Sequence, residues 1–118
     1  MITTEIHRLY NAFHYSMAGL KAAWDNEAPF RLEVVSSVVI IPLALVLGQN
    51  GVERAILIGV WMLVLIAELL NSGLEAITDY ATKGEIHPLA KNTKDIGSAA
   101  VFIALVTAAL TWVLILGY

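Results

Sequence analysis

Four polar residues follow one another along one side of a helix in the middle of the chain. Glu68, Asn71, Glu75 and Asp79 are spaced by three, four and four positions, and this spacing stacks side chains on a single helical face. The row begins in an otherwise apolar segment. A carboxylate at membrane depth is disfavoured by about 2.5 to 3.5 kcal/mol, so it should face protein, water or a cation. Glu68 is therefore a candidate general base.

Further carboxylates are expected at the same membrane boundary, because Glu27 and Glu33 lie where the first apolar segment begins. Carboxylates that meet repel one another unless a cation joins them. Mg²⁺ suits such a set because it commonly bridges one or two carboxylates to substrate phosphates, and Arg8, Arg31 and Lys94 are expected near enough to hold those phosphates. The residues favour a metal-assisted phosphoryl-transfer site. A proton or cation pathway, or plain hydrogen bonding between helices, stays open.

The composition is that of a membrane protein. Of the 118 residues, 58% are hydrophobic and only 14% are charged, which is rare in a soluble domain of this size. The net charge of -3 includes no basic block, so no nucleic-acid partner is expected. Cysteine is absent, which excludes disulfides and thiolate chemistry. No glycine-rich phosphate loop of a standard nucleotide-binding fold is present.

The elements that must position the polar row are four helices in one membrane-embedded domain, residues 1–118. In residues 5–26 the larger apolar side chains recur every three or four positions, which predicts an amphipathic helix on the membrane surface. Three helices long enough to cross a hydrocarbon core of about 30 Å are then predicted at residues 30–48, 52–80 and 94–117.

The breaks between these helices carry their own signals. Pro29 is best tolerated in a first helical turn, so the chain is expected to redirect just before it. Residues 48–51 predict a tight turn, and residues 80–94, with Gly84, Pro88 and mixed charges, predict a loop. A ridge of alanines at four-residue spacing on the last helix suits close packing; its members are Ala100, Ala104 and Ala108.

Lysine and arginine predict the orientation in the membrane. Six of them lie before the first span or between the second and third, and one lies in the short first hairpin. By the positive-inside rule the N-terminus and the longer loop are cytoplasmic and the C-terminus is on the opposite side. Tyr80, Trp112 and Tyr118 near the helix ends fit interfacial aromatic belts.

Several strings of residues over nearly the whole chain form a recognisable set. They are Tyr15-Ser16 with Gly19-Leu20-Lys21-Ala22-Ala23-Trp24, Asn26-Glu27-Ala28 with Phe30-Arg31, Glu68-Leu69-Leu70-Asn71-Ser72 with Glu75-Ala76 and Asp79, and Lys94-Asp95 with Gly97-Ser98-Ala99-Ala100-Val101. In order and spacing they resemble the surface helix, the second-helix signature and the start of the third helix of bacterial integral-membrane diacylglycerol kinases, Gram-negative type.

The resemblance implies a homotrimer of three-span subunits in the bacterial inner membrane, with a periplasmic C-terminus and active sites shared between subunits. It implies transfer of the ATP γ-phosphate to diacylglycerol, with Mg²⁺, to give phosphatidic acid. Glu68 would be the base towards the lipid hydroxyl, and Glu27 and Glu75 would lie at the metal ions. Asn71 would support the site.

Nucleotide contacts are also implied for Arg8, Lys94 and Asp95. Glu85 and His87 are included because they lie in the loop nearest the acidic residues. The full set of predicted substrate- and nucleotide-contacting residues is Arg8, Tyr15, Asn71, Glu75, Asp79, Glu85, His87, Lys94 and Asp95.

Two alternative functions stay open at this point. Related Gram-positive proteins that share the acidic helix prefer undecaprenol, so an undecaprenol kinase is the nearer alternative. A small cation-coupled transporter is the more distant one, because a membrane glutamate can also bind cations. Such transporters usually have four spans and no long charged cytoplasmic loop, which argues against that class.

Overall fold

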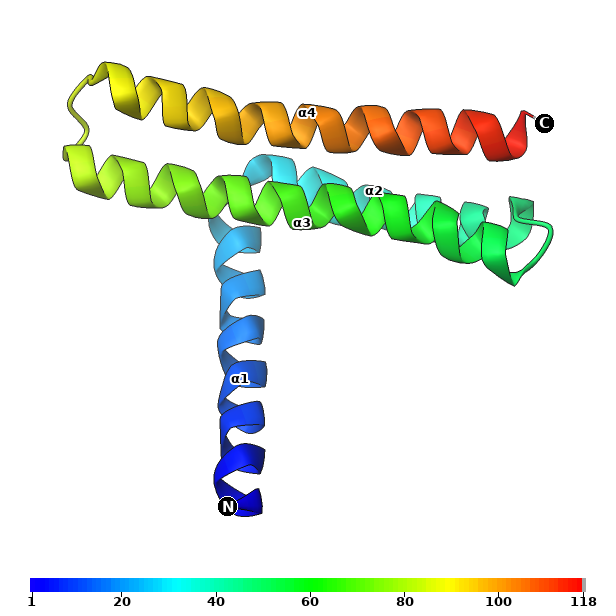
Figure 1. Cartoon of the computed structure of the whole chain (residues 1–118), viewed down its shortest axis with the longest axis horizontal. Helices are drawn as coiled ribbons and strands as arrows, with labels where there is room; N and C mark the ends of the chain where they lie inside the picture. Colours follow the sequence, from blue (N-terminus) through cyan, green and yellow to red (C-terminus); the bar gives the residue numbers. More distant parts are fainter. Residues whose placement is uncertain (118) are drawn as a thin grey trace.

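Four α-helices make up the computed structural model, which describes residues 1–117 (Figure 1). In chain order they are α1 (Ile2–Asn26), α2 (Ala28–Leu47), α3 (Gly51–Thr82) and α4 (Pro88–Leu116). The last three lie along one another as a bundle, while α1 leaves the bundle sideways from its junction with α2. The predicted all-helical architecture is confirmed. Tyr118, which was expected in an aromatic belt, lies outside the described residues.

α2, α3 and α4 are each long and apolar enough to cross a membrane. In the most apolar stretch of each helix, only 11 to 22% of the residues are buried within the chain. The rest of this apolar surface must face lipid or other protein, because a soluble monomer does not expose contiguous apolar patches of that extent. The chain is therefore a membrane protein, as its composition predicts.

The core of the bundle lies where α3 packs on α4, the most extensive contact between helices. Its buried members are Val64, Ala104 and Ala108, with Trp61 packed against them. Alanines at four-residue spacing allow the two backbones to approach closely, which is how helices associate where no water drives them together. The predicted packing role of the alanine ridge is confirmed for Ala104 and Ala108.

Two tryptophans link the spanning helices by hydrogen bonds. Trp61 Nε1 on α3 donates to Ser37 Oγ on α2 at 2.7 Å, and Trp112 Nε1 on α4 donates to the Leu57 carbonyl of α3 at 3.2 Å. Buried indole N–H groups ordinarily need such partners. These two bonds fix how α2 and α4 sit along α3.

The turn between α2 and α3 is closed by capping interactions. Asn50 Oδ1 accepts a hydrogen bond from the Glu53 N–H at 2.9 Å, the usual N-cap pattern. Arg54 Nε donates to the carbonyls of Leu45 and Gly48 at 3.0 and 3.2 Å. These carbonyls lie at the end of α2, where intrahelical partners run out. A cation at that end is also favoured by the helix dipole.

The prediction of a loop over residues 80–94 is wrong for most of that range. α3 continues to Thr82, and α4 begins at Pro88. His87 Nδ1 accepts a hydrogen bond from the Leu89 N–H at 3.1 Å, so His87 caps α4. Proline is well tolerated in a first turn because its missing N–H would be unpaired there. The connection is thus residues 83–87, turned by left-handed Lys83 and by Gly84 at φ 79°.

Candidate active site

The buried face of α3 is apolar in the first half of the helix and polar in the second half. Leu57 and Val64 are fully buried in the first half of α3, and the same stripe continues with Glu68, Asn71 and Thr78, which are 6, 8 and 7% exposed. Successive members are seven, four, three and seven positions apart, which keeps them on one helical face. The predicted polar row is therefore turned into the bundle at Glu68 and Asn71.

A glycine on α4 makes room for the polar part of this stripe. Gly97 is buried opposite Asn71, and a Cβ built on Gly97 would overlap Asn71 Oδ1. Asn71 Oδ1 is buried without a hydrogen-bond partner, while its Nδ2 makes a long hydrogen bond of 3.5 Å to Glu75 Oε1. Asn71 therefore packs against Gly97 of α4 and donates a hydrogen bond to the carboxylate of Glu75.

Glu27 lies at the junction of α1 and α2. It adopts an extended conformation, φ -120° and ψ 102°, between the two helices, and Pro29 lies in the first turn of α2. The predicted change of direction at this point is confirmed. Arg31 on α2 donates to the carbonyls of Trp24 and Asp25 at 2.6 and 3.2 Å. Arg31, considered as a phosphate ligand from the sequence, thus holds the end of α1.

The junction brings acidic side chains of separate helices together. The carboxyl group of Glu68 interacts electrostatically with those of Glu75 and Glu27, and Glu33 on α2 interacts with Glu68. The three ion pairs in residues 1–117 join other groups: Lys21 with Asp25, Lys91 with Asp95 and Lys94 with Asp79. Within residues 1–117, none of the converging carboxylates is part of an ion pair, although Lys94 interacts electrostatically with Glu75.

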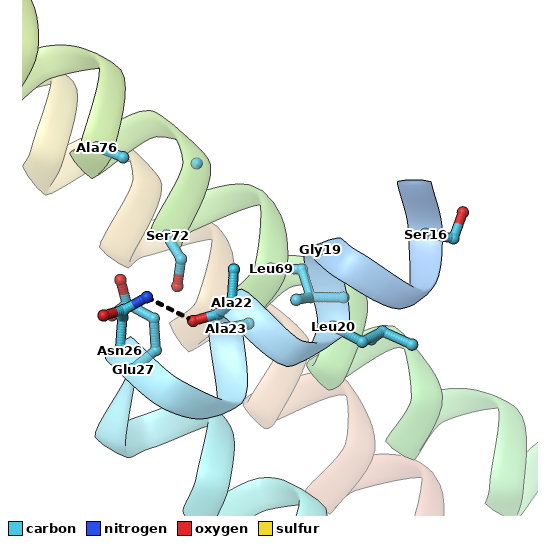
Figure 2. Close-up of a pocket in the computed structure, with 11 residues that line it drawn as sticks. Ser16, Gly19, Leu20, Ala22, Ala23, Asn26, Glu27, Leu69, Ser72 and Ala76 are labelled. Carbon is cyan, nitrogen blue, oxygen red and sulfur yellow. Dashed lines mark hydrogen bonds between the residues drawn. The ribbon is translucent and has the colours of Figure 1, made fainter. Parts of the chain in front are cut away.

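A cleft of about 680 Å³ opens beside this acidic group, between α1 and α3. Figure 2 shows Glu27 and Asn26 at one side of it, facing Ser72 and Ala76 of α3. Its walls are mainly small or apolar residues, with Gly19, Leu20, Ala22 and Ala23 from α1 and Leu69 and Gly73 from α3. An apolar cleft with a few polar groups at its edge is the usual form of a small-molecule site.

A second group of predicted residues lies further along α3 and α4. Asp79, Glu85, His87 and Lys94 line a cleft of about 280 Å³ at the connection between these helices. Lys94 is paired there with Asp79. Asp95 is exposed and accepts a hydrogen bond from Lys91 at 2.7 Å. This group combines cationic and anionic side chains at the end of the bundle.

The structure does not bring Arg8 and Tyr15 to either group. Both are exposed on α1, whose N-terminal end extends far from the other helices in Figure 1. At a helical rise of about 1.5 Å per residue, Arg8 lies about 28 Å along α1 from Glu27. Within this chain, Arg8 is therefore too far along α1 to contact a phosphate bound near Glu27.

The acidic group matches the kind of magnesium site in which substrate phosphates supply the remaining ligands. No set of three or more His, Asp or Glu side chains that could hold a metal is present in residues 1–117 of one subunit. Mg²⁺ is usually held by one or two carboxylates together with waters and phosphates. Glu27 and Glu75, which are in no ion pair within residues 1–117, supply that kind of donor.

Comparison with known proteins identifies the family. The family model for prokaryotic diacylglycerol kinase matches residues 14–116. The chain belongs to this prokaryotic diacylglycerol kinase family. The match covers the end of α1, the junction at Glu27 and all three spanning helices.

Relatives named diacylglycerol kinase are similar to this chain over almost their whole length. A diacylglycerol kinase of Pseudomonas aeruginosa is 50% identical over 113 residues, covering 96% of this chain and 91% of the relative. One of Escherichia coli K12 is 44% identical over 114 residues, covering 97% and 93%. One of Haemophilus influenzae is 41% identical over 110 residues, covering 93% and 92%. The resemblance noted in the sequence is therefore shown, and the chain is a kinase.

Some residues around the site of this diacylglycerol kinase family member were not predicted. Thr78 is buried on the site face of α3 and donates to the Leu74 carbonyl at 2.6 Å. It lies seven residues after Asn71, so the repeat that begins at Leu57 and Val64 indicated its position. Ser72 and Gly73 in the wall of the first cleft had no such signal, because their role depends on where α1 lies.

Proposed function

We propose that this protein phosphorylates diacylglycerol to phosphatidic acid, with ATP as phosphate donor and Mg²⁺ as metal ion. The observation that carries the proposal is the convergence of Glu27, Glu68 and Glu75 beside an apolar cleft, where none of the three is in an ion pair within residues 1–117. The family membership and the relatives' names support the same substrate.

Glu68 acts as the general base in this proposal. It accepts the proton of the lipid hydroxyl while the hydroxyl oxygen forms a bond to the γ-phosphorus. The bond from that phosphorus to the bridging oxygen breaks, and its electron pair leaves with ADP. Phosphoryl transfer of this kind depends mainly on placement and charge neutralisation, and burial of Glu68 favours the first of these.

Glu27 and Glu75 would hold Mg²⁺, which would supply neutralisation of charge on the phosphate oxygens of ATP. Asn71 orients Glu75 through its amide. Lys94 and Asp95 contact the nucleotide, with Asp79, Glu85 and His87 around them. Lys94 is released from Asp79 when a phosphate takes its place.

The lipid reaches Glu68 through the cleft between α1 and α3. The mainly small and apolar walls of that cleft suit acyl and glycerol groups, and the hydroxyl only has to reach the polar edge near Glu27. Tyr15 lies on α1 close to Ser16, which lines the cleft, and contacts the lipid headgroup region. The acyl tails stay in the bilayer.

α1 lies on the cytoplasmic surface of the bacterial inner membrane. It runs crosswise to the three spanning helices (Figure 1), the direction expected for a helix in the interface plane. The N-terminus and the connection between α3 and α4 face the cytoplasm, where ATP is available, and the C-terminus faces the periplasm.

The active protein is a homotrimer with sites shared between subunits. Two observations support a shared site. Arg8 lies about 28 Å along α1 from the carboxylates of its own subunit, and most of the surface of each spanning helix is unburied within one subunit. Other copies are able to cover part of that surface and to place Arg8 at a neighbouring site.

A lipid-kinase assay on the purified protein tests the proposal. Protein reconstituted with diacylglycerol and MgATP should form phosphatidic acid, and a chelator should abolish the reaction until Mg²⁺ is restored. Undecaprenol in a parallel assay provides the comparison. Faster phosphorylation of undecaprenol would contradict the proposed substrate, and no MgATP-dependent labelling of either lipid would contradict the kinase assignment to this chain.

A further inference from the structure

Arg31 is bonded to both helices at the junction of α1 and α2, and the mechanism above gives it no part. It belongs to the first turn of α2, and its backbone N–H donates to the Glu27 carbonyl at 3.1 Å. Its side chain reaches back to α1, where Nη1 donates to the carbonyls of Trp24 and Asp25 at 2.6 and 3.2 Å. The side chain of Arg31 therefore ties two separate helices together.

The guanidinium supplies what the end of α1 lacks. The last carbonyls of a helix have no partner within that helix, and they form the negative end of the helix dipole. The Glu27 N–H donates to the Ala23 carbonyl at 2.8 Å, so the carbonyls of Trp24 and Asp25 are the next to need partners. The last turn of α1 has no basic residue of its own. A cation from α2 meets this need.

Little else within the chain fixes the direction of α1. Ala23 is the one buried residue of α1, all of which the structure describes, and it lies near the end of the helix. Glu27 links α1 to α2 in an extended conformation, and the N-terminal part of α1 extends away from the other helices in Figure 1. The direction of α1 therefore depends on the bonds at this junction.

The turn of α1 that Arg31 holds also lines the proposed lipid cleft. Ala23 and Asn26 contribute to the α1 wall of the cleft of about 680 Å³ (Figure 2). The two carbonyls that accept from Arg31, those of Trp24 and Asp25, lie between these residues in sequence. A change in the direction of α1 would move this wall towards or away from α3, and so change the width of the cleft.

We propose that Arg31 is a positioning residue for the lipid substrate, because it keeps α1 in the direction that leaves the cleft between α1 and α3 open. This role rests on the proposed function, whereas the hold of Arg31 on α1 does not. Apparent affinity falls in proportion to the fraction of time that a protein spends in its binding-competent state. Loss of the Arg31 side chain should therefore weaken lipid binding rather than slow phosphoryl transfer.

Spin-label distances test the hold on α1 without an activity assay. The chain has no cysteine, so Glu5→Cys and Ile77→Cys place labels on exposed sites of α1 and α3 alone. Glu5 lies about 33 Å along α1 from Glu27, so a small change of direction moves it far. Labelled chains diluted with excess unlabelled chains report distances within one chain. The distance should be narrowly distributed with Arg31 present and broad in Arg31→Ala.

Kinetics test the effect on the lipid. Arg31→Ala should raise KM for diacylglycerol about tenfold, the order of effect of losing one hydrogen bond from a charged group. Both kcat and KM for MgATP should change little, because Glu27 keeps its backbone bonds to Ala23 and to the N–H of residue 31. Arg31→Lys keeps the charge and N–H donors but not the planar fork, so it should recover part of the lost affinity.

Arg54→Ala is the matched control. Arg54 Nε also donates to two carbonyls at a helix end, those of Leu45 and Gly48, but at the opposite end of α2. Its loss should lower the thermal stability by a similar amount. The label distance and KM for diacylglycerol should nevertheless stay as in the unmodified protein, because the junction of α1 and α2 is untouched.

The outcomes separate the inference from the proposed function. A narrow distance in Arg31→Ala overturns the hold on α1, and so does equal broadening in Arg54→Ala. A broad distance with an unchanged KM for diacylglycerol overturns the positioning role. A rise in KM for MgATP alone would instead make Arg31 a phosphate ligand and also overturns that role. If the distances behave as expected but no lipid is phosphorylated, the hold on α1 stands and the proposed function fails.

Discussion

Glu68 and Asn71 occupy buried positions where α3 would be easier to insert with leucine or alanine. Replacing buried charged groups with apolar ones of similar size is often neutral or stabilising, so packing does not explain why these residues are polar. Their neighbours support a chemical role instead. The carboxyl groups of Glu27 and Glu75 interact electrostatically with that of Glu68. Gly97 on α4 leaves room for the side chain of Asn71.

Glu68→Gln should abolish turnover while the fold is kept. The amide has nearly the same shape but cannot take the lipid proton, and loss of a general base lowers rates by about 10²- to 10⁴-fold. MgATP-dependent formation of phosphorylated lipid measures the effect. Thermal unfolding of the same sample is the control, and it should show no loss of stability. Turnover within about threefold of the unmodified protein would reject Glu68 as the base.

Gly97→Ala should destabilise the contact between α3 and α4. The added Cβ overlaps Asn71 Oδ1 and lies 3.4 Å from Leu74 Cδ1, so the side chain of Asn71 has to move. Overpacking of this kind costs about 1 to 3 kcal/mol. The transition temperature in detergent is the measurement.

Gly59→Ala is the matched control for this change. A Cβ at Gly59 meets nothing within 4 Å, and alanine favours a helix over glycine by about 0.5 to 1 kcal/mol. Gly59→Ala should therefore be neutral or stabilising. If Gly97→Ala unfolds at the same temperature as Gly59→Ala, the close approach at Gly97 does not matter to stability.

At the scale of helices, the first two spans carried clear local signals. Gly48 and Gly51 bracket the turn between α2 and α3, and Pro29 starts α2 after Glu27. The start of α4 was missed because Pro88 and the mixed charges after it suggest a loop. A proline in a first turn looks the same as a proline that breaks a helix, and His87 is an uncommon cap.

The site was predictable only in part, because periodicity shows which residues share a helical face but not how separate helices pack. Periodicity places Glu68, Asn71 and Glu75 on one face of α3, so the polar row could be predicted. The meeting of Glu27 with this row depends on how the chain turns at the junction. How Glu33 on α2 lies relative to Glu68 on α3 depends on the register set by the Trp61–Ser37 hydrogen bond, which no local pattern encodes.

Removal of the His87 cap should loosen the first turn of α4. His87→Ala leaves the Leu89 N–H without its acceptor, at a cost of about 1 kcal/mol. Hydrogen exchange of the Leu89 amide should therefore be faster. His87→Asn is the control, because asparagine is a strong N-cap residue and should restore protection. Equal exchange in all three proteins would mean that the cap contributes nothing.

At the scale of the whole molecule, a site shared between subunits predicts complementation: two inactive variants should regain activity when they assemble together. Arg8→Ala and Glu68→Gln subunits should each be inactive in pure form. When they are mixed and reassembled from denaturant, some sites should combine an intact Glu68 with an intact Arg8 of a neighbour. Phosphorylated lipid is the readout.

The mixture of separately assembled proteins, combined without exchange of subunits, is the control and should stay inactive. If reassembled mixtures are no more active than this control, each site uses the Arg8 and Glu68 of the same chain. α1 would then have to take another direction, in which Arg8 lies close to the bundle of its own chain.

The exposed surface of α3 changes from apolar to charged along the helix, and this has a consequence for the bilayer. Sliding the bundle along the membrane normal would carry the exposed Asp79 into hydrocarbon or the exposed Leu63 into water, and both are disfavoured. The depth of the protein in the membrane is therefore fixed. A bilayer that is too thick or too thin has to change its thickness locally, or the helices have to tilt. Turnover should consequently have an optimum of acyl-chain length set by bilayer thickness, separate from any preference for the chains of the substrate.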